Sequence, residues 1–277
     1  MDNDIEKIRK IIYNKFAKYT FHEDSHTYTY IDNNGEERTI GISTTQFIHS
    51  FSEPFDEDKM SKIVARRDGL TQQQVLDQWA FNRELACEYG TLAHLYLECL
   101  WMNYPFLYDK NRIVEKFGYD PVTPKFEAIK PALKKFYDIF NERLEIIGAE
   151  VVIASEDYDI AGSIDLLAYS KKLKAIIIID NKSNKEIKKE GYKGKTMKPP
   201  LNHLQDSNYW HYSMQGAIYK KIIEYETGIK VSDRKFLIWF DFETLDFHII
   251  ECANLDKEVE LVLEERRKQN DRYNKSM

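Results

Sequence analysis

The sequence predicts an α/β fold in which a β-sheet core follows a helical N-terminal part. Helical patterns dominate residues 5–147, and apolar strand-like runs cluster within 149–180. A further helix at 208–227 is followed by a hairpin within 235–251. Helices, then clustered strands, then a helix with more strands are typical of a sheet covered by helices, and 277 residues suit one large domain.

The N-terminal half is predicted to contain one hairpin among several helices. Thr71 and Gln74 match a capping box, which marks the start of a helix. Gly90 is expected to break that helix. The expected elements, in order, are a helix at 5–19, a hairpin at 27–42, a helix capped within 43–45, helices at 71–89 and 90–103, and a long helix at 124–147.

The C-terminal half is predicted to supply the sheet. Strands are expected at 149–155, 162–169 and 174–180. The third contains four consecutive isoleucines, which indicate a strand that is buried on both faces. Residues 183–204 are polar and basic and predict a loop, and a charged helix is expected at 255–272.

Composition favours a globular protein inside the cell. Apolar residues make up 43% of the chain, and no apolar run approaches the roughly 18 residues that span a membrane. The N-terminus is acidic and lacks the pattern of a signal peptide, so a cytoplasmic location without membrane association is expected. The three unclustered cysteines argue against disulfides, a zinc finger and an iron–sulfur cluster.

Two acids and a lysine lie in or beside predicted strands. Asp165 lies within an apolar strand, Asp180 ends the isoleucine strand, and Lys182 follows on the same face as Asp180. Buried carboxylates need a cation, and a divalent metal with an adjacent ammonium would form a phosphodiesterase site. A structural Asp–Lys pair at a strand end, with Asp165 in a turn, is the alternative.

Two pairs of polar residues lie four apart on predicted helices and therefore share a helix face. His94 and Glu98 could bind a metal or orient each other, although a hydrogen-bonded core histidine is the simpler interpretation. Gln215 and Tyr219 also suit ordinary packing. On the strand before Asp165, Glu150 and Glu156 are expected to be exposed or salt-bridged, although one of them could reach the site.

These motifs occur in a specific order: Gly-Thr-x-x-His-x-x-x-Glu from Gly90, Gly-x-x-Asp ending at Asp165, Asp-x-Lys from Asp180, and Gln-x-x-x-Tyr from Gln215. The ordered set resembles the RecB-like exonuclease branch of the PD-(D/E)XK nuclease superfamily over roughly residues 90–225. Residues 202–208 also resemble phage-encoded nucleases of this type.

The resemblance implies a mixed central sheet flanked by helices, with a restriction-endonuclease-like core. It implies one nuclease domain over residues 1–277. Within it, residues 1–89 form an N-terminal hairpin and helical elaboration, 90–251 the core, and 252–277 a C-terminal helix.

The resemblance also implies roles for individual residues. His94, Asp165, Asp180 and the carbonyl of Asn181 would bind Mg²⁺ or Mn²⁺, although Asn181 stands where the family often has an aromatic residue. Lys182 would be catalytic, and the other catalytic-site residues would be Gln215, Tyr219 and Glu98.

DNA is the expected partner despite a net charge of −6, because a basic segment follows Lys182. We expect a mobile loop that contacts DNA through Lys185, Lys188, Lys189, Lys193, Lys195 and Lys198. No ATP site is expected, because Lys189 stands where a phosphate-binding loop ending at Gly194 would need glycine. Any helicase, recombination or replication partner would be a separate chain.

The resemblance favours an exonuclease that acts from DNA ends. Two alternatives stay open at this point. One is a structure-specific or restriction-type endonuclease of the same fold, and the other is a DNA-binding or assembly protein that keeps the fold without turnover.

Overall fold

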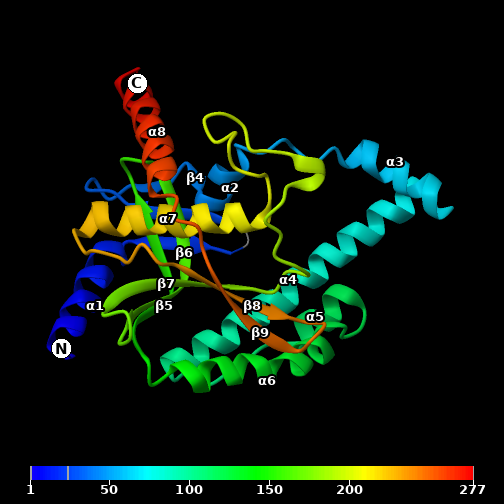
Figure 1. The fold of residues 1–277 in the computed structure, drawn as a ribbon, viewed down its shortest axis with the longest axis horizontal. Coiled ribbons are helices and arrows are strands. Elements are labelled where there is room, and N and C mark those ends of the chain that lie inside the picture. Colours follow the sequence, from blue (N-terminus) through cyan, green and yellow to red (C-terminus); the bar gives the residue numbers. More distant parts are fainter. Residues whose placement is uncertain (1, 24, 277) are drawn as a thin grey trace.

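The computed structural model describes residues 2–23 and 25–276. A six-stranded mixed sheet flanked by helices forms its centre, which confirms the predicted α/β fold class with a helical N-terminal part (Figure 1). The helices are α1 (Asp2–Phe16), α2 (Thr44–His49), α3 (Glu57–Asp68), α4 (Gln72–Met102), α5 (Lys110–Phe117), α6 (Val122–Phe140), α7 (Asn208–Thr227), α8 (Asp256–Ser276) and the short 3₁₀ turn η1 (Tyr192–Gly194). The strands are β1 (Tyr19–His22), β2 (Thr27–Ile31), β3 (Glu37–Thr39), β4 (Ile42–Ser43), β5 (Leu144–Ser155), β6 (Ile160–Ser170), β7 (Ala175–Lys182), β8 (Phe236–Asp241) and β9 (Asp246–Glu251).

Strand β6 is central because it pairs with three other strands. It pairs antiparallel with β5 along its whole length and with β7 along its C-terminal half, and in parallel with the short β4. The sheet continues through a parallel β7–β8 pair to an antiparallel β8–β9 pair. Strands β1, β2 and β3 form a separate antiparallel sheet. This order places β5, β6 and β7 side by side, and these strands carry most of the predicted acids.

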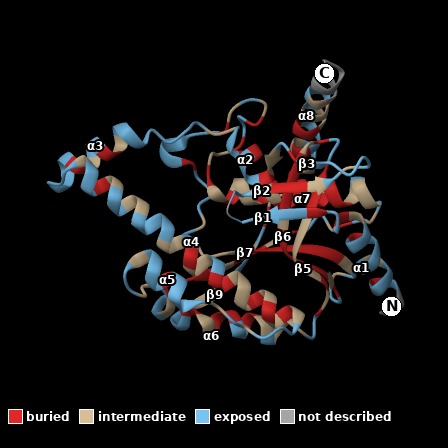
Figure 2. Cartoon of the chain, turned by 180° about the vertical axis from the view of Figure 1, so that it is seen from behind, coloured by how far each residue is buried: buried red, intermediate tan, exposed pale blue. Residues whose placement is uncertain are grey.

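The isoleucines of β7 connect the two halves of the hydrophobic core. Ile176 and Ile178 lie in a cluster with side chains of α1, α7 and α8, whereas Ile177 and Ile179 lie in a cluster with α4 and α6. All four are at most 6% exposed, so the prediction of a strand buried on both faces is confirmed. Figure 2 shows that burial is concentrated in the sheet, while α3 and the first turns of α4 are largely exposed.

Helix α4 does not break at Gly90, so that prediction is wrong. The helix opens with the predicted capping box of Thr71 and Gln74 and runs unbroken to Met102. A Cβ on Gly90 would lie 3.3 Å from Ser183 Oγ, so the glycine lets the helix approach the end of β7 closely. The expected boundary between residues 89 and 90 falls inside this helix.

The long helix predicted at 124–147 also needs correction. Helix α6 ends at Phe140, and β5 begins at Leu144, which pairs with Ser170 of β6. Pairing with the central strand overrides the local helical pattern, because tertiary context outweighs intrinsic propensity. Helices α3 and α5 and strand β1 were not predicted. Among the described residues, no helix is both long and apolar enough to cross a membrane.

Candidate active site

Two strands and one helix bring three potential metal ligands together. Glu150 of β5, Asp165 of β6 and His94 of α4 each offer a ligand atom, and these atoms all lie within 4.8 Å of one another. His94 Nδ1 lies 3.2 Å from Glu150 Oε1 and 3.7 Å from Asp165 Oδ2. The imidazole therefore bridges two carboxylates that come from neighbouring strands.

Asp180 and Lys182 extend this group onto β7. The β6–β7 ladder pairs Leu166 with Ile179, so Asp165 and Asp180 are the next residues on the two strands. Lys182 Nζ lies 2.7 Å from Asp180 Oδ2, which places both side chains on one face as the strand period of two predicts. We call His94, Glu150, Asp165, Asp180 and Lys182 the acidic cluster.

The carboxylates of the acidic cluster have few partners within the protein. The backbone N–H of Asn181 donates to Asp165 Oδ2 at 2.5 Å. Asp180 Oδ2 is buried with the Lys182 ammonium 2.7 Å away as its charged partner, whereas Asn181 Oδ1 is buried without a hydrogen-bond partner among the described residues and belongs to the opposite face of β7. His94 and Lys182 supply two positive groups to three carboxylates, so a further cation would complete the balance of charge. The donor set therefore fits a divalent metal.

Burial and crowding of like charges shift the pKa values in the cluster. Burial raises the pKa of Asp180 to about 6, although the charge of Lys182 opposes this shift. Burial also raises the pKa of Asp165, and the charge of Glu150 adds to the effect. Burial alone would lower the pKa of His94, but Asp165 and Glu150 outweigh it and raise the value to about 9. Likewise, Asp180 and Asp165 raise the pKa of Lys182 against the effect of burial. The carboxylates therefore favour the charged forms of His94 and Lys182.

Glu150 lies among the potential ligands and pairs with His94, an outcome that the sequence left open beside solvent exposure or a salt bridge. Its backbone has φ 47°, which non-glycine residues rarely adopt, in a strand whose register already shifts between Ile146 and Gly148. The carboxylate accepts a hydrogen bond from Ser163 Oγ at 3.3 Å. Strained backbone conformations concentrate at functional sites, so the irregular strand gives Glu150 a place in the cluster. Simple strand alternation could not predict this placement.

Two other predicted acids lie outside the group of close ligand atoms. Glu98 is half-buried one turn after His94, and burial together with the charge of Glu150 raises its pKa. Glu156 forms an ion pair with Lys18 at 2.5 Å, which confirms the expectation of a salt bridge. Only Glu98 therefore adds to the electrostatics of the site.

Helix α7 supports the cluster through Tyr219, which is 3% exposed. Gln215 Nε2 donates to the Tyr219 hydroxyl at 2.8 Å. A Cβ on Gly162 would lie 2.5 Å from Tyr219 Cε1, a distance that real atoms do not adopt. The glycine of Gly-x-x-Asp therefore makes room for the tyrosine of Gln-x-x-x-Tyr, and the two motifs are in direct contact.

Tyr212, which the sequence analysis did not single out, contacts the lysine of the cluster. Lys182 Nζ lies 4.6 Å from the centre of the Tyr212 ring. The Tyr212 hydroxyl donates to Asn184 Oδ1 at 2.8 Å. Its position three residues before Gln215 on the same helix was the available signal. Tyr212 and Asp180 together hold the ammonium in place.

The basic loop after Lys182 is more ordered than predicted. Its backbone is tied to α7, because the Lys188 N–H donates to Asn208 Oδ1 at 2.7 Å and Trp210 Nε1 donates to the Lys189 carbonyl at 3.0 Å. Met197, Leu201 and Leu204 are each at most 4% exposed, which gives the segment an apolar anchor. The loop therefore packs against α7 and the core through contacts that its polar, basic sequence did not predict.

The six loop lysines differ in their partners. Lys188 pairs with Glu186, Lys198 lies 3.6 Å from Glu53, and Lys189 lies over the ring of Tyr209. Within the described ranges, the loop lysines without an acidic partner are Lys185, Lys189, Lys193 and Lys195. They are exposed and remain available to an anion.

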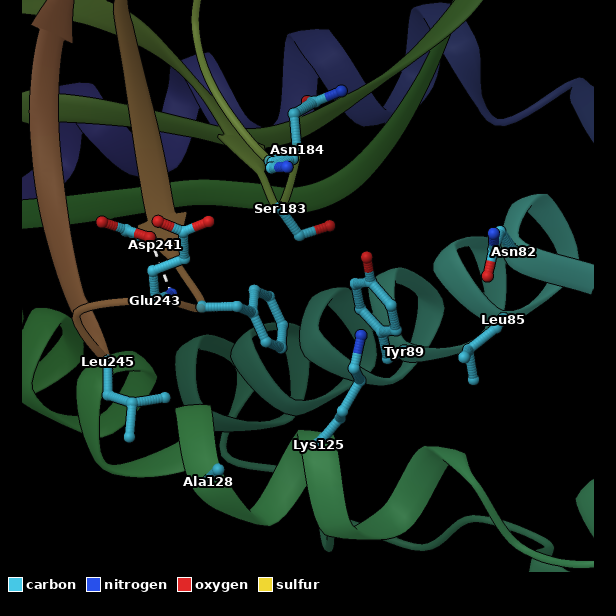
Figure 3. A pocket seen from close by; sticks show the side chains of 12 residues that line it. Asn82, Leu85, Tyr89, Lys125, Ala128, Ser183, Asn184, Asp241, Glu243 and Leu245 are labelled. Carbon is cyan, nitrogen blue, oxygen red and sulfur yellow. Dashed lines mark hydrogen bonds between the residues drawn. The ribbon is translucent and has the colours of Figure 1, made fainter. Parts of the chain in front are cut away.

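A cavity of about 430 Å³ opens beside the acidic cluster. Figure 3 shows Ser183 and Asn184 at the end of β7 on one side and Tyr89 of α4 with Lys125 of α6 on the other. The turn between β8 and β9 completes the wall with Asp241, Phe242, Glu243 and Leu245. None of the five cluster residues lines the cavity, but Ser183 directly follows Lys182.

No protein-family model and no curated protein matches this chain. Among solved structures, the chain is similar to one from Eubacterium rectale that is described as a "Putative exonuclease". The two share 18% sequence identity with a TM-score of 0.47, and the match covers 83% of this chain and 79% of the other. The function proposed below rests on the side chains of the site.

The contact between Gly162 and Tyr219 gives a first prediction. Gly162→Ala should lower the free energy of unfolding by about 1–3 kcal/mol, because the added methyl group meets a fully packed ring. The cost should be much smaller in a Tyr219→Leu background, where the ring is absent. Chemical denaturation of the four proteins of this double-mutant cycle measures the coupling. Equal costs in both backgrounds would show that the two motifs do not depend on each other.

Proposed function

We propose that this chain is a divalent-cation-dependent nuclease that hydrolyses phosphodiester bonds of DNA, acting as an exonuclease of the RecB-like PD-(D/E)XK branch. The observation that carries the proposal is the convergence of His94, Glu150 and Asp165 beside the Asp180–Lys182 ion pair. Carboxylates concentrated beside an ammonium suit a reaction in which a metal and a cation act on one phosphate.

The proposed metal ligands are His94, Asp165 and Asp180. Glu150 is added because it lies beside His94 and Asp165, and the carbonyl of Asn181 is added because the resemblance to RecB-like nucleases implies it. Three carboxylates supply the hard oxygen ligands that Mg²⁺ prefers, and one imidazole is equally suited to Mn²⁺. When bound, such an ion supplies Lewis-acid polarisation of the phosphodiester and activation of water.

Lys182 is proposed to stabilise charge on the reacting phosphate. Its ammonium contacts Asp180 and lies against Tyr212, so it is oriented before substrate arrives. A preorganised donor costs no reorganisation during reaction, which is the usual source of electrostatic catalysis. Gln215 and Tyr219 are proposed as positioning residues, because Tyr219 packs on the β6 strand that carries Asp165.

Cleavage of DNA tests the proposal directly. We expect end-labelled linear DNA to be degraded with Mg²⁺ or Mn²⁺ and to remain intact in EDTA. Closed circular DNA should resist, because an exonuclease needs an end. Cleavage that persists in EDTA would contradict the mechanism. Nicking of closed circular DNA would show that the protein is an endonuclease and not an exonuclease. A protein that binds DNA without cutting it under any of these conditions would instead be a binding or assembly protein.

Substitutions should separate the lysine from the metal ligands. Lys182→Ala should lower kcat by about 10²–10³-fold, comparable to removal of another preorganised donor. It should retain metal binding, because a charged lysine cannot be a ligand. Asp180→Ala should lose both catalytic activity and metal binding. Calorimetric titration of Mn²⁺ measures the metal binding of each variant. Loss of metal binding in Lys182→Ala alone would reverse the assigned roles.

We propose that the unpaired loop lysines contact DNA phosphates. Replacing Lys193 and Lys195 with glutamine should weaken binding across all sequences. It should also flatten the log–log salt dependence by about 0.7–0.9 for each lost contact. Lys172 and Lys174 lie in the turn between β6 and β7, at the opposite end of β7, and their replacement is the matched control. An unchanged salt slope in the loop variant would exclude the loop from the DNA interface.

A further inference from the structure

The cavity beside the acidic cluster has walls that suit a flat aromatic ligand. The rings of Tyr89 and Phe242 lie 4.8 Å apart between centroids and are inclined at 50° to each other. Both side chains are only half-buried, so ring surface remains accessible. A cavity of about 430 Å³ falls within the size range of small-molecule sites.

The polar groups of the cavity provide both cations and an acceptor. Lys125 Nζ lies 4.9 Å from the centre of the Tyr89 ring. In the chain as described, neither Lys125 nor Lys185 forms an ion pair with an acid, and the Glu243 carboxylate forms none with a base. Asp241 is different, because it accepts hydrogen bonds from the Glu243 N–H and the Thr244 hydroxyl within its own turn. Two cations and one carboxylate therefore remain free for a ligand.

Residues that line the cavity and residues of the acidic cluster lie near each other on two elements. On α4, Tyr89 precedes His94 by five residues, which corresponds to about 7–8 Å along the helix axis. On β7, Ser183 follows Lys182 without a gap. A nucleotide whose phosphate lies at the cluster would therefore place its base or its neighbour's base at the cavity.

We infer that this cavity binds an unstacked nucleobase of the strand that is cleaved, and that the substrate is therefore single-stranded DNA. The inference rests on the proposed function for the identity of the ligand. Because the Tyr89 and Phe242 rings contact each other, a base would stack on the accessible face of one of them inside the cavity, where it is unavailable for pairing, so a duplex would first have to separate. Lys125 and Lys185 would contact the flanking phosphates, and Glu243 would accept a hydrogen bond from an N–H of the base, such as N3–H of thymine. Base–aromatic stacking is a common means of holding single strands.

Binding without turnover tests this inference. Fluorescence anisotropy in EDTA compares an oligothymidylate with an abasic sugar-phosphate oligomer of equal length and charge. The unmodified protein should prefer the oligothymidylate by about tenfold, as expected for one stacked base. Tyr89→Leu should lose most of this preference and leave the affinity for the abasic oligomer unchanged. Tyr13→Leu changes an exposed tyrosine of α1, remote from the cavity, and should alter neither affinity.

Two results would overturn the inference. One is an equal affinity of the unmodified protein for both oligomers, including failure to bind either. The other is a preference that survives in folded Tyr89→Leu. A photo-cross-link from an oligonucleotide containing 5-iodouracil tests the same point without any substitution. Mass spectrometry should map it to Tyr89 or Phe242, and a cross-link confined to other elements would contradict the cavity as the base site.

These outcomes are distinguishable from failure of the proposed nuclease function. If the protein binds bases in a way that depends on Tyr89 but never cleaves DNA, the base-binding site is supported and the proposed nuclease function is contradicted. If the protein degrades double-stranded and single-stranded DNA equally fast, and this rate does not depend on Tyr89, the nuclease function is supported and the base-binding site is contradicted.

Discussion

The organisation of this protein depends on one electrostatic constraint, the burial of several like charges at one end of the sheet. Asp165 and Asp180 are each at most 9% exposed, and Glu150 lies on the neighbouring strand. In an apolar interior, each carboxylate destabilises the others unless positive charge lies among them. His94 and Lys182 supply part of that charge. We propose that a divalent cation supplies the rest.

The fold maintains this arrangement through contacts beneath the cluster. The isoleucine strand is packed on both faces, which holds β6 and β7 in register at the point where Asp165 and Asp180 lie. Gly162 allows the Tyr219 ring to lie against β6, and Gly90 allows α4 to approach the end of β7. At both glycines a side chain would crowd a neighbouring element, so the close packing around the site favours glycine at these two positions.

Much of this arrangement follows from sequence patterns, because alternation places Asp180 and Lys182 on one face and a helical period relates Gln215 to Tyr219. The role of Glu150 did not follow, because it depends on a register shift and a positive φ that no local pattern encodes. The break expected at Gly90 was wrong for a related reason. A glycine that permits close packing and a glycine that ends a helix are identical in the sequence, and only tertiary contacts distinguish them.

Titration of Mn²⁺ into the protein and its Glu150→Gln variant tests the central claim most directly, with Glu156→Gln, in the turn that follows the same strand, as the matched control. The account predicts saturable binding by the unmodified protein and by Glu156→Gln, with a rise in Tm because the ion binds the folded state. It predicts affinity at least about tenfold weaker in Glu150→Gln, which removes one charged oxygen ligand. Absence of saturable binding in the unmodified protein, or equal affinity in all three proteins, would contradict the claim that these side chains form a metal site.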